Sequence, residues 1–392
     1  MASTALKVNP SNSNSNLRIA WLLPSAFYYW QPAISKLAQM FPQTTVFTGL
    51  WQGFAPGFEN TFAVEVLERK IIQLTRTSTG YGNNFTYLPL NIVSRLLRFK
   101  PHLIFTSSFG IWTMLALLLK PLAKWRVVIA YEGSSPSVDF RGSAPRLALR
   151  RAMVKAADAL ITNSHAGKAY LIDILKAKEN NVFHQPYEVP ATTALVGCNK
   201  EDKQSNLHQL QQPVFLFVGG IIPRKGLHLL LEACVVLQKQ GYRNYTLLVV
   251  GDGAQRQELE AFSENHALAD CVKWAGRVNY GNLGAYFNSA DVFVLPTLED
   301  TWGVVVLEAM ALGKPVLCSK WAGAAEMVIE GENGYLFEPQ QPEELAKVMR
   351  RFIEQPNLSK SMGDKSQQLM AQHTPEVAAQ FLAKVTSFAV SN

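Results

Sequence analysis

The chain of 392 residues is 48% hydrophobic and 17% charged, which is typical of a globular protein with large cores, and its length favours two domains. Its four cysteines lack CxxC spacing and its seven histidines lack HExxH spacing, so we expect reduced thiols and no structural metal. The net charge of +7 is uneven, with 20 Lys and Arg against 9 Asp and Glu in residues 1–198 and 17 against 21 in residues 199–392.

The first half opens with a polar tail, residues 1–16, which we expect to be disordered and which lacks the apolar region of a secretory signal. The apolar run 103–119 contains Thr, Ser and Gly, so it predicts a buried strand and a buried helix rather than a membrane span. Strands are predicted over 18–23, 102–106, 126–130 and 159–162, and helices over 32–40, 111–119 and 145–157. Apolar strands that alternate with helices predict a parallel sheet covered on both faces, here a domain over 17–198.

The polar stretch 199–212 predicts a linker, after which the same alternation begins again. Strands are predicted over 214–218, 245–250, 272–275, 292–295 and 315–318, and helices over 226–240, 255–266, 283–289 and 304–312. The second domain is expected over 213–374, with a helix over 375–392 that packs back on the first. Two doubly wound domains predict a cleft, with ligands bound beyond the carboxyl ends of the strands.

The strongest local motif is LPTLEDTWGVVVLEAMALGKP, residues 295–315. A strand leads through an acidic loop into a helix that opens at Gly303, and the first turn of such a helix suits a diphosphate. Asp300 and Glu308 are carboxylates that can accept hydrogen bonds from sugar or ribose hydroxyls. The alternative is an ordinary strand, loop and helix with a capping acid.

A second motif, FVGGIIPRKG at 217–226, follows another strand. Gly219 and Gly220 permit close backbone approach, and Arg224 and Lys225 can neutralise phosphates; a basic surface turn is the alternative. Two weaker glycine turns follow. VGDG ends the next strand, and VKWAGRV ends the strand after it at Gly276 and Arg277, where backbone groups could contact a base or form a plain turn.

The order of these motifs, with AGAAEMV and ENGYLF after them, resembles family 4 of the retaining glycosyltransferases (glycosyl transferases group 1). The resemblance covers about 125 residues of the second half closely and the first half only in architecture. It implies the GT-B fold and transfer of a hexose from a nucleotide diphosphate sugar, a UDP-sugar, with retention of configuration. It implies no cofactor beyond this donor and no metal, because cations and a helix start can stabilise the leaving diphosphate.

The resemblance also implies roles for particular acids. Glu308 matches the acid that holds the ribose. Asp300 falls on the acid that contacts the donor sugar, but the family usually has Glu there and this chain has Glu299 one place earlier. Either Asp300 or Glu299 is therefore expected to face the sugar.

The matching basic and backbone groups are expected to hold the rest of the donor. Lys225 matches the lysine on the diphosphate, and Arg224 is expected to replace the basic residue that the family often has at the position of Gly220. The backbone that would cradle the donor belongs to Trp302, Gly303 and Val304.

Two loops of the first half depart from the family. The first strand is followed by PSAFYYWQP instead of a glycine-rich loop, and its aromatic side chains could stack on a sugar, grip a lipid or form a buried cluster. Where many relatives have a histidine, this chain reads AYEGSSP. Glu132 is therefore a candidate catalytic residue, or alternatively a buried acid that caps the following turn.

Between residues 95 and 155 the chain has eleven cations and two acids. The cations are Arg95, Arg98, Lys100, Lys120, Lys124, Arg126, Arg141, Arg146, Arg150, Arg151 and Lys155. Helical spacing places Arg146 beside Arg150 and Arg151 beside Lys155, opposite an apolar side with Leu149, and two tryptophans lie in the same region.

Such a surface predicts docking on an anionic membrane, with a solvated basic face as the alternative and no motif for nucleic acid. We therefore expect a cytoplasmic enzyme, peripheral at the inner face of a membrane. Its acceptor would be a glycolipid or a lipid-linked saccharide. The competing functions are a sugar-nucleotide epimerase of the same fold and an inert nucleotide-binding protein.

Overall fold

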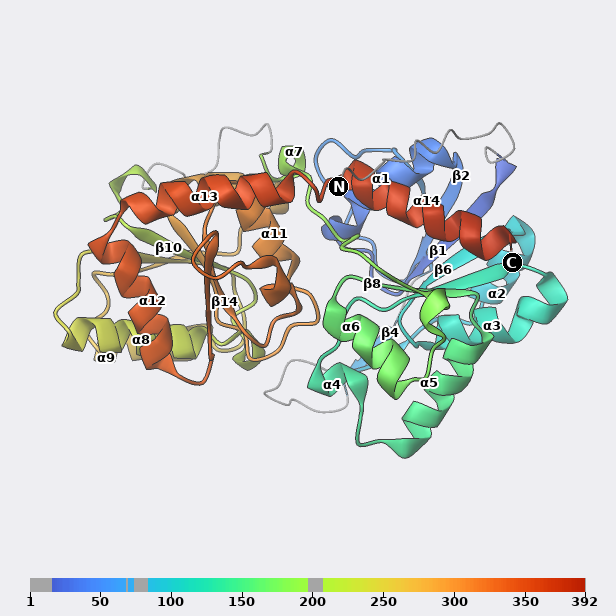
Figure 1. The fold of residues 1–392 in the computed structure, drawn as a ribbon, viewed down its shortest axis with the longest axis horizontal. Coiled ribbons are helices and arrows are strands. Elements are labelled where there is room, and N and C mark those ends of the chain that lie inside the picture. The colour runs from blue at the N-terminus through green and yellow to red at the C-terminus, as the bar shows by residue number, and fades with distance from the viewer. Residues whose placement is uncertain (1–15, 68–69, 74–83, 197–206, 392) are drawn as a thin grey trace, which may run out of the picture.

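The computed structural model describes residues 16–67, 70–73, 84–196 and 207–391. It has two lobes, each a parallel sheet between layers of helices (Figure 1). Most of the predicted tail and of the predicted linker, together with Cys198, lie outside the described residues. The other three cysteines are buried and unpaired.

The first domain has a seven-stranded parallel sheet in the order β3-β2-β1-β6-β7-β8-β9. The strands are β1 (Arg18–Leu23), β2 (Gln43–Thr48), β3 (Ala63–Val66), β6 (Leu103–Ser107), β7 (Arg126–Ala130), β8 (Ala159–Thr162) and β9 (Val182–His184), beside an antiparallel hairpin of β4 (Lys70–Gln73) and β5 (Asn84–Tyr87). Its α-helices are α1 (Gln31–Met40), α2 (Ile92–Phe99), α3 (Ile111–Ala123), α4 (Pro136–Asp139), α5 (Ala144–Ala156), α6 (His165–Ala169) and α7 (Thr192–Leu195). The run 103–119 therefore contains a buried strand, as predicted, but the helix that follows is only partly buried, because Leu118 is 66% exposed.

The second domain has a six-stranded parallel sheet in the order β12-β11-β10-β13-β14-β15. Its strands are β10 (Val214–Val218), β11 (Thr246–Val250), β12 (Val272–Gly276), β13 (Val292–Leu295), β14 (Val316–Ser319) and β15 (Gly334–Phe337). The helices are α8 (Leu227–Lys239), α9 (Arg256–Asn265), α10 (Leu283–Ser289), α11 (Val304–Ala311), α12 (Pro342–Glu354), α13 (Asn357–Met370) and α14 (Pro375–Ser391). The prediction of two doubly wound parallel sheets is confirmed.

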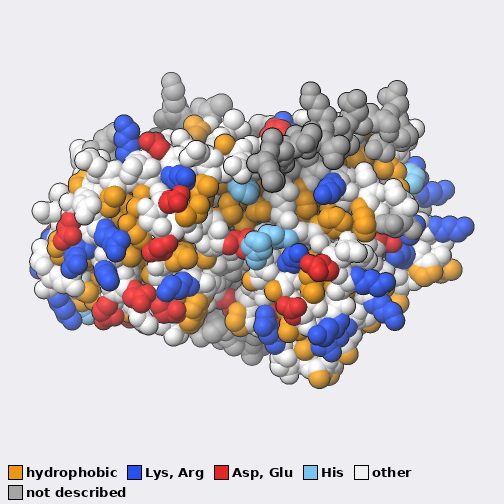
Figure 2. All heavy atoms as spheres, in the orientation of Figure 1, with side chains coloured by type: hydrophobic (Ala, Val, Ile, Leu, Met, Phe, Trp, Pro, Cys, Tyr) orange, Lys and Arg blue, Asp and Glu red, His pale blue; other side chains and the backbone are white. Residues whose placement is uncertain are grey.

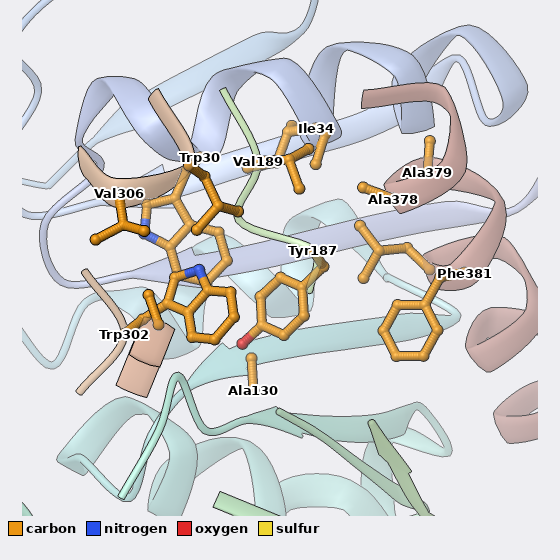
Figure 3. Packing of buried hydrophobic residues seen from close by; sticks show 14 of the residues in the cluster. Trp30, Ile34, Ala130, Tyr187, Val189, Trp302, Val306, Ala378, Ala379 and Phe381 are labelled. Carbon is orange, nitrogen blue, oxygen red and sulfur yellow. The ribbon is translucent and has the colours of Figure 1, made fainter. Parts of the chain in front are cut away.

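The carboxy-terminal helix α14 returns to the first domain, where it lies along α1 (Figure 1). An ion pair of 3.0 Å joins Lys36 of α1 to Glu376 of α14. Buried apolar side chains continue across the domain boundary, because Trp30 of the first domain and Trp302 of the second belong to one cluster (Figure 3). Apolar packing therefore fixes part of the boundary between the two domains.

Part of the predicted basic surface is wrong, because Arg150 is buried. Its Nη1 donates to the Asp139 carbonyl at 3.0 Å and to the Tyr170 hydroxyl at 2.9 Å, and its guanidinium lies 5.0 Å from the centre of the Phe109 ring. A guanidinium with fixed acceptors and an aromatic face is stabilised inside the domain. Arg150 therefore does not share an exposed row with Arg146.

The two tryptophans assigned to that surface are also buried. Trp112 donates its indole N–H to the Pro89 carbonyl, and Trp125 donates to the Ala116 carbonyl. An indole buries a large apolar area when its single donor has a partner. The prediction that Leu149 lies on an apolar side of the helix opposite the cations is also wrong, because its side chain is half exposed.

Among the helices of the described residues, none is long and apolar enough to cross a membrane.

Candidate active site at the domain boundary

The two motif loops of the second domain meet at an ion pair. Lys225, at the end of the loop after β10, places its Nζ 2.5 Å from Oδ2 of Asp300 in the loop after β13. Gly226, with φ of +69°, permits this approach, since a Cβ there would lie 2.0 Å from the Pro296 carbonyl oxygen. The structure thus brings together the lysine and the acid that the sequence placed 75 residues apart.

Arg224 lies beside Lys225 and holds the acidic loop. Its Nη1 donates to the Glu299 carbonyl at 2.8 Å, and its own carbonyl accepts from the backbone N–H of Leu298, also at 2.8 Å. Arg224 therefore positions the loop that carries Asp300.

The two neighbouring acids point to different partners. Glu299 reaches the first domain, where its Oε1 accepts from the backbone N–H of Ser137 at 2.7 Å and from the Ser137 hydroxyl at 2.6 Å. Asp300 is buried beside Lys225. Glu299 thus joins the domains, whereas Asp300 lies at the centre of the site.

Glu308 lies inside α11, which begins after Gly303 (φ +94°). Its Oε1 accepts a hydrogen bond of 3.0 Å from the hydroxyl of Tyr280. Burial raises the pKa of Glu308 to about 7, although the Tyr280 hydrogen bond opposes the shift. The Tyr280 ring stacks on Tyr28 of the first-domain aromatic loop, with centroids 5.0 Å apart, so Tyr28 contacts the second domain.

The other predicted donor-binding groups lie at the carboxyl edge of the second sheet. Gly219 donates its N–H to the Val250 carbonyl, Gly220 is exposed, and the Gly276 carbonyl accepts from the N–H of Gly251 at 2.8 Å. Arg277 is exposed directly after β12. These four predicted residues line one edge, as parallel-sheet topology requires.

The residues at the start of α11 differ in burial. The Trp302 side chain is buried, and its indole Nε1 donates to the carbonyl of Glu188 in the first domain at 3.3 Å. Val304 is the first residue of the helix and is partly buried.

The first domain contributes two acids that approach Asp300. Burial raises the pKa of Glu132 to about 7, and the charge of Asp300 adds to the shift. Glu188 is almost completely buried, and its pKa is raised well above the ordinary value, first by burial and then by the charge of Glu132. Such a cluster of carboxyl groups favours proton retention at neutral pH.

Sequence reasoning missed Glu188. It lies in QPYEVP, after β9, and its N–H donates to Oδ1 of Asn163 at 3.1 Å. An acid between apolar residues is a signal of unusual burial, but nothing in the sequence connects this segment to Glu132.

The capping alternative for Glu132 is not supported, because Asp139 fills that role. The Asp139 carboxylate accepts from the backbone N–H of Ser135 at 3.3 Å and from the Ser134 hydroxyl at 2.7 Å. Next to Glu132, Gly133 packs so closely on the second domain that a Cβ would lie 1.9 Å from the Thr301 carbonyl oxygen. Glu132 is therefore held at the domain boundary.

Comparison with known proteins agrees with this geometry. Residues 199–369 match the family model described as Glycosyl transferases group 1. The chain is similar to D-inositol 3-phosphate glycosyltransferase of Streptomyces avermitilis, with 28% identity over 260 residues, 64% of this chain and 55% of that protein. It spans about half the length of the curated relatives it matches.

Two solved structures share the architecture. HepE from Anabaena, solved in complex with UDP, superposes with a TM-score of 0.72 at 19% identity, over 95% of this chain and 100% of that chain. Sucrose-phosphate synthase from Thermosynechococcus elongatus gives a TM-score of 0.71 at 20% identity, over 95% of this chain and 98% of that chain. By its motifs, its two-sheet architecture and these matches, the chain has the GT-B fold, and its second domain matches the glycosyl transferases group 1 family.

Proposed function

We propose that this protein is a retaining glycosyltransferase that moves a hexose from a nucleotide diphosphate sugar, a UDP-sugar, to a membrane-associated acceptor. The observation that carries the proposal is the Lys225–Asp300 pair, which lies where the two motif loops of the second domain meet. A lysine and a carboxylate side by side suit the two ends of a donor, since one neutralises phosphate and the other accepts hydrogen bonds from sugar hydroxyls. HepE, a structural neighbour, was solved with UDP-glucose.

In the proposed donor complex, Glu308 accepts hydrogen bonds from the ribose hydroxyls. Lys225 releases Asp300 in part to contact the diphosphate, and the N–H groups at the start of α11 add positive potential. Asp300, rather than Glu299, then faces the donor sugar, because Glu299 is held by Ser137. Gly219, Gly220, Gly276 and Arg277 complete the nucleotide side.

In the proposed reaction, the acceptor hydroxyl oxygen attacks the anomeric carbon while the bond from that carbon to the diphosphate oxygen breaks. The acceptor proton passes to the departing phosphate oxygen on the same face, so the configuration is retained. Lys225 and the helix start stabilise the charge on the leaving group, which is the largest contribution expected of the protein. We expect no metal to be required.

Glu132 and Glu188 are proposed to position the transferred sugar. Because their pKa values are raised, a protonated carboxyl group can donate a hydrogen bond to a sugar hydroxyl at neutral pH, as well as accept one. The proposal is supported by the charge of Asp300, which contributes to the raised pKa of both acids.

The direct test is incubation of the purified protein with a panel of sugar nucleotides and a membrane lipid extract. We expect one UDP-hexose to yield a glycosylated lipid by mass spectrometry, with the anomeric configuration of the donor retained by NMR. An epimerised sugar nucleotide, or binding with neither transfer nor donor hydrolysis, would contradict the proposal.

The proposal that the acceptor is membrane-associated rests on a surface of cations and exposed leucines over three neighbouring helices, α2, α3 and α5. Its exposed leucines are Leu97, Leu118, Leu122 and Leu149, and its exposed cations are Arg98, Lys124, Arg146, Arg151 and Lys155. Cations gather over this part of the first domain at the right of Figure 2. Exposed leucines among cations suit an anionic bilayer, which attracts the charges and receives the apolar side chains. The enzyme would then be peripheral at the cytoplasmic face of a membrane.

This face is tested by flotation with vesicles that contain anionic phospholipid. We expect binding at low salt, and the double variant Lys124→Glu and Arg151→Glu should lose about 2 kcal/mol, roughly a 30-fold loss of vesicle affinity. The matched control is Lys239→Glu with Lys273→Glu, exposed cations of the second domain. Equal flotation of the two double variants, or no flotation of the native protein, would remove the membrane role.

A further inference from the structure

Two histidines of the first domain face one glutamate of the second. His165 is the first residue of α6. His184 is the last residue of β9, which pairs with the neighbouring strand β8. Glu326 lies in the 3-10 turn Gly323–Met327. Figure 2 shows histidine side chains at the boundary between the domains, near the middle of the view. His184 follows His165 by 19 positions, and Glu326 follows His184 by 142 positions. No short sequence motif could therefore reveal the cluster.

The three side chains place their donor atoms within one small volume. One ligand atom from each residue can be chosen so that all lie within 4.8 Å of one another. His184 Nε2 is 3.4 Å from Oε1 of Glu326, and the two imidazole rings have centroids 4.1 Å apart. The other oxygen, Oε2, accepts the backbone N–H of His165 at 2.8 Å, which orients the carboxylate.

We propose that His165, His184 and Glu326 form a binding site for a divalent transition metal, most suitably Zn²⁺, that joins the two domains. Two imidazoles and a carboxylate are a ligand set of zinc sites, and a water completes the tetrahedron. His165 is exposed, so the ion can enter from solvent. A simple ion pair explains one histidine beside the glutamate, but it gives no role to a second imidazole packed against the first.

The three ligands are not among the residues assigned to the donor. They come from both domains, and a bound ion therefore stabilises the arrangement in which the domains touch. Only this arrangement offers all three ligands, so the metal shifts the population toward it.

Binding is measured on the untagged full chain after dialysis against a chelator, without any sugar nucleotide. We expect one Zn²⁺ per chain by calorimetry, and visible d–d absorption with Co²⁺ as the probe. His165→Ala, His184→Ala and Glu326→Gln should each weaken Zn²⁺ binding at least tenfold. Glutamine retains an oxygen that can accept from the His165 N–H, so this variant removes the anionic ligand while keeping that contact. His266→Ala, at an exposed histidine outside the cluster, should bind like the native chain.

Whether bound Zn²⁺ holds the two domains together is measured by amide hydrogen exchange. Zn²⁺ should slow amide exchange in segments 163–168 and 323–328 of the native chain, and not in Glu326→Gln. No Zn²⁺ binding, or binding that the three substitutions leave unchanged, would overturn the site. Unchanged exchange with bound Zn²⁺ would overturn the joining of the domains. Because neither readout depends on sugar transfer, failure here leaves the proposed glycosyltransferase activity untouched.

Discussion

Replacing Lys225 by methionine is expected to lower sugar transfer by about 10² to 10³-fold, which corresponds to about 2.7–4 kcal/mol of transition-state stabilisation. In the proposed reaction, the leaving diphosphate gains charge as the anomeric bond breaks, and Lys225 Nζ is the cation at the meeting point of the two motif loops. Methionine keeps an unbranched side chain, one heavy atom shorter than that of lysine, and removes the charge and the hydrogen-bond donors. The measurement is the initial rate of transfer at saturating donor.

The same substitution leaves the buried Asp300 without its cation, which can destabilise the fold. A thermal unfolding curve is therefore recorded for Lys225→Met and for the double variant with Asp300→Asn, in which no unpaired charge remains. Lys239→Met, at an exposed lysine, is the matched control. Transfer by Lys225→Met within a few-fold of the native rate, in a folded protein, would refute the role of Lys225.

Glu308→Ala is the second large effect, with an expected loss of transfer of about two orders of magnitude and weaker donor binding. The carboxylate is proposed to hold the ribose, and loss of a charged acceptor for a bidentate contact costs about 1.5–3 kcal/mol. Because the pKa of Glu308 is raised to about 7, binding should also depend on pH. The carboxylate is mostly ionised at pH 8 and mostly protonated at pH 6, so affinity for UDP-glucose should fall about tenfold as the pH drops between these values.

UDP-glucose is the suitable probe, because its β-phosphate is esterified to glucose and lacks the second ionisation that the terminal phosphate of UDP undergoes in the same pH range. Glu308→Gln should bind it weakly at both pH values, since glutamine does not titrate. Glu132 has a similar pKa, and Glu132→Gln should retain the pH dependence of binding. A pH profile that disappears in Glu132→Gln and persists in Glu308→Gln would contradict the assignment of the ribose contact to Glu308.

The sequence motifs predict some features of the site at the domain boundary and not others. The pairing of Lys225 with Asp300 follows from two strand ends that lie side by side, β10 and β13, in one parallel sheet. Local features sufficed here, because apolar strands, a glycine turn and a basic turn are each visible within ten residues. The sequence could therefore predict both the second domain and its motif residues.

The separate positions of Glu299 and Asp300 could not be predicted, because adjacent residues of a loop point in directions set by distant partners. Ser137 of the first domain holds Glu299, and Lys225 of the second holds Asp300. The same holds for Arg150, whose spacing indicated an exposed row but whose guanidinium reaches a carbonyl and a hydroxyl inside the domain.

The sequence by itself determined two doubly wound domains, the motif order of the second and the candidate donor residues, because short-range periodicity and glycine turns encode these features. Only the tertiary structure decided that Glu188 approaches Glu132, that Asp300 rather than Glu299 lies at the centre of the site, and that His165, His184 and Glu326 meet. These contacts join segments from different strands or different domains. Their physical cause is the packing of the two lobes against each other, which no window of the sequence contains.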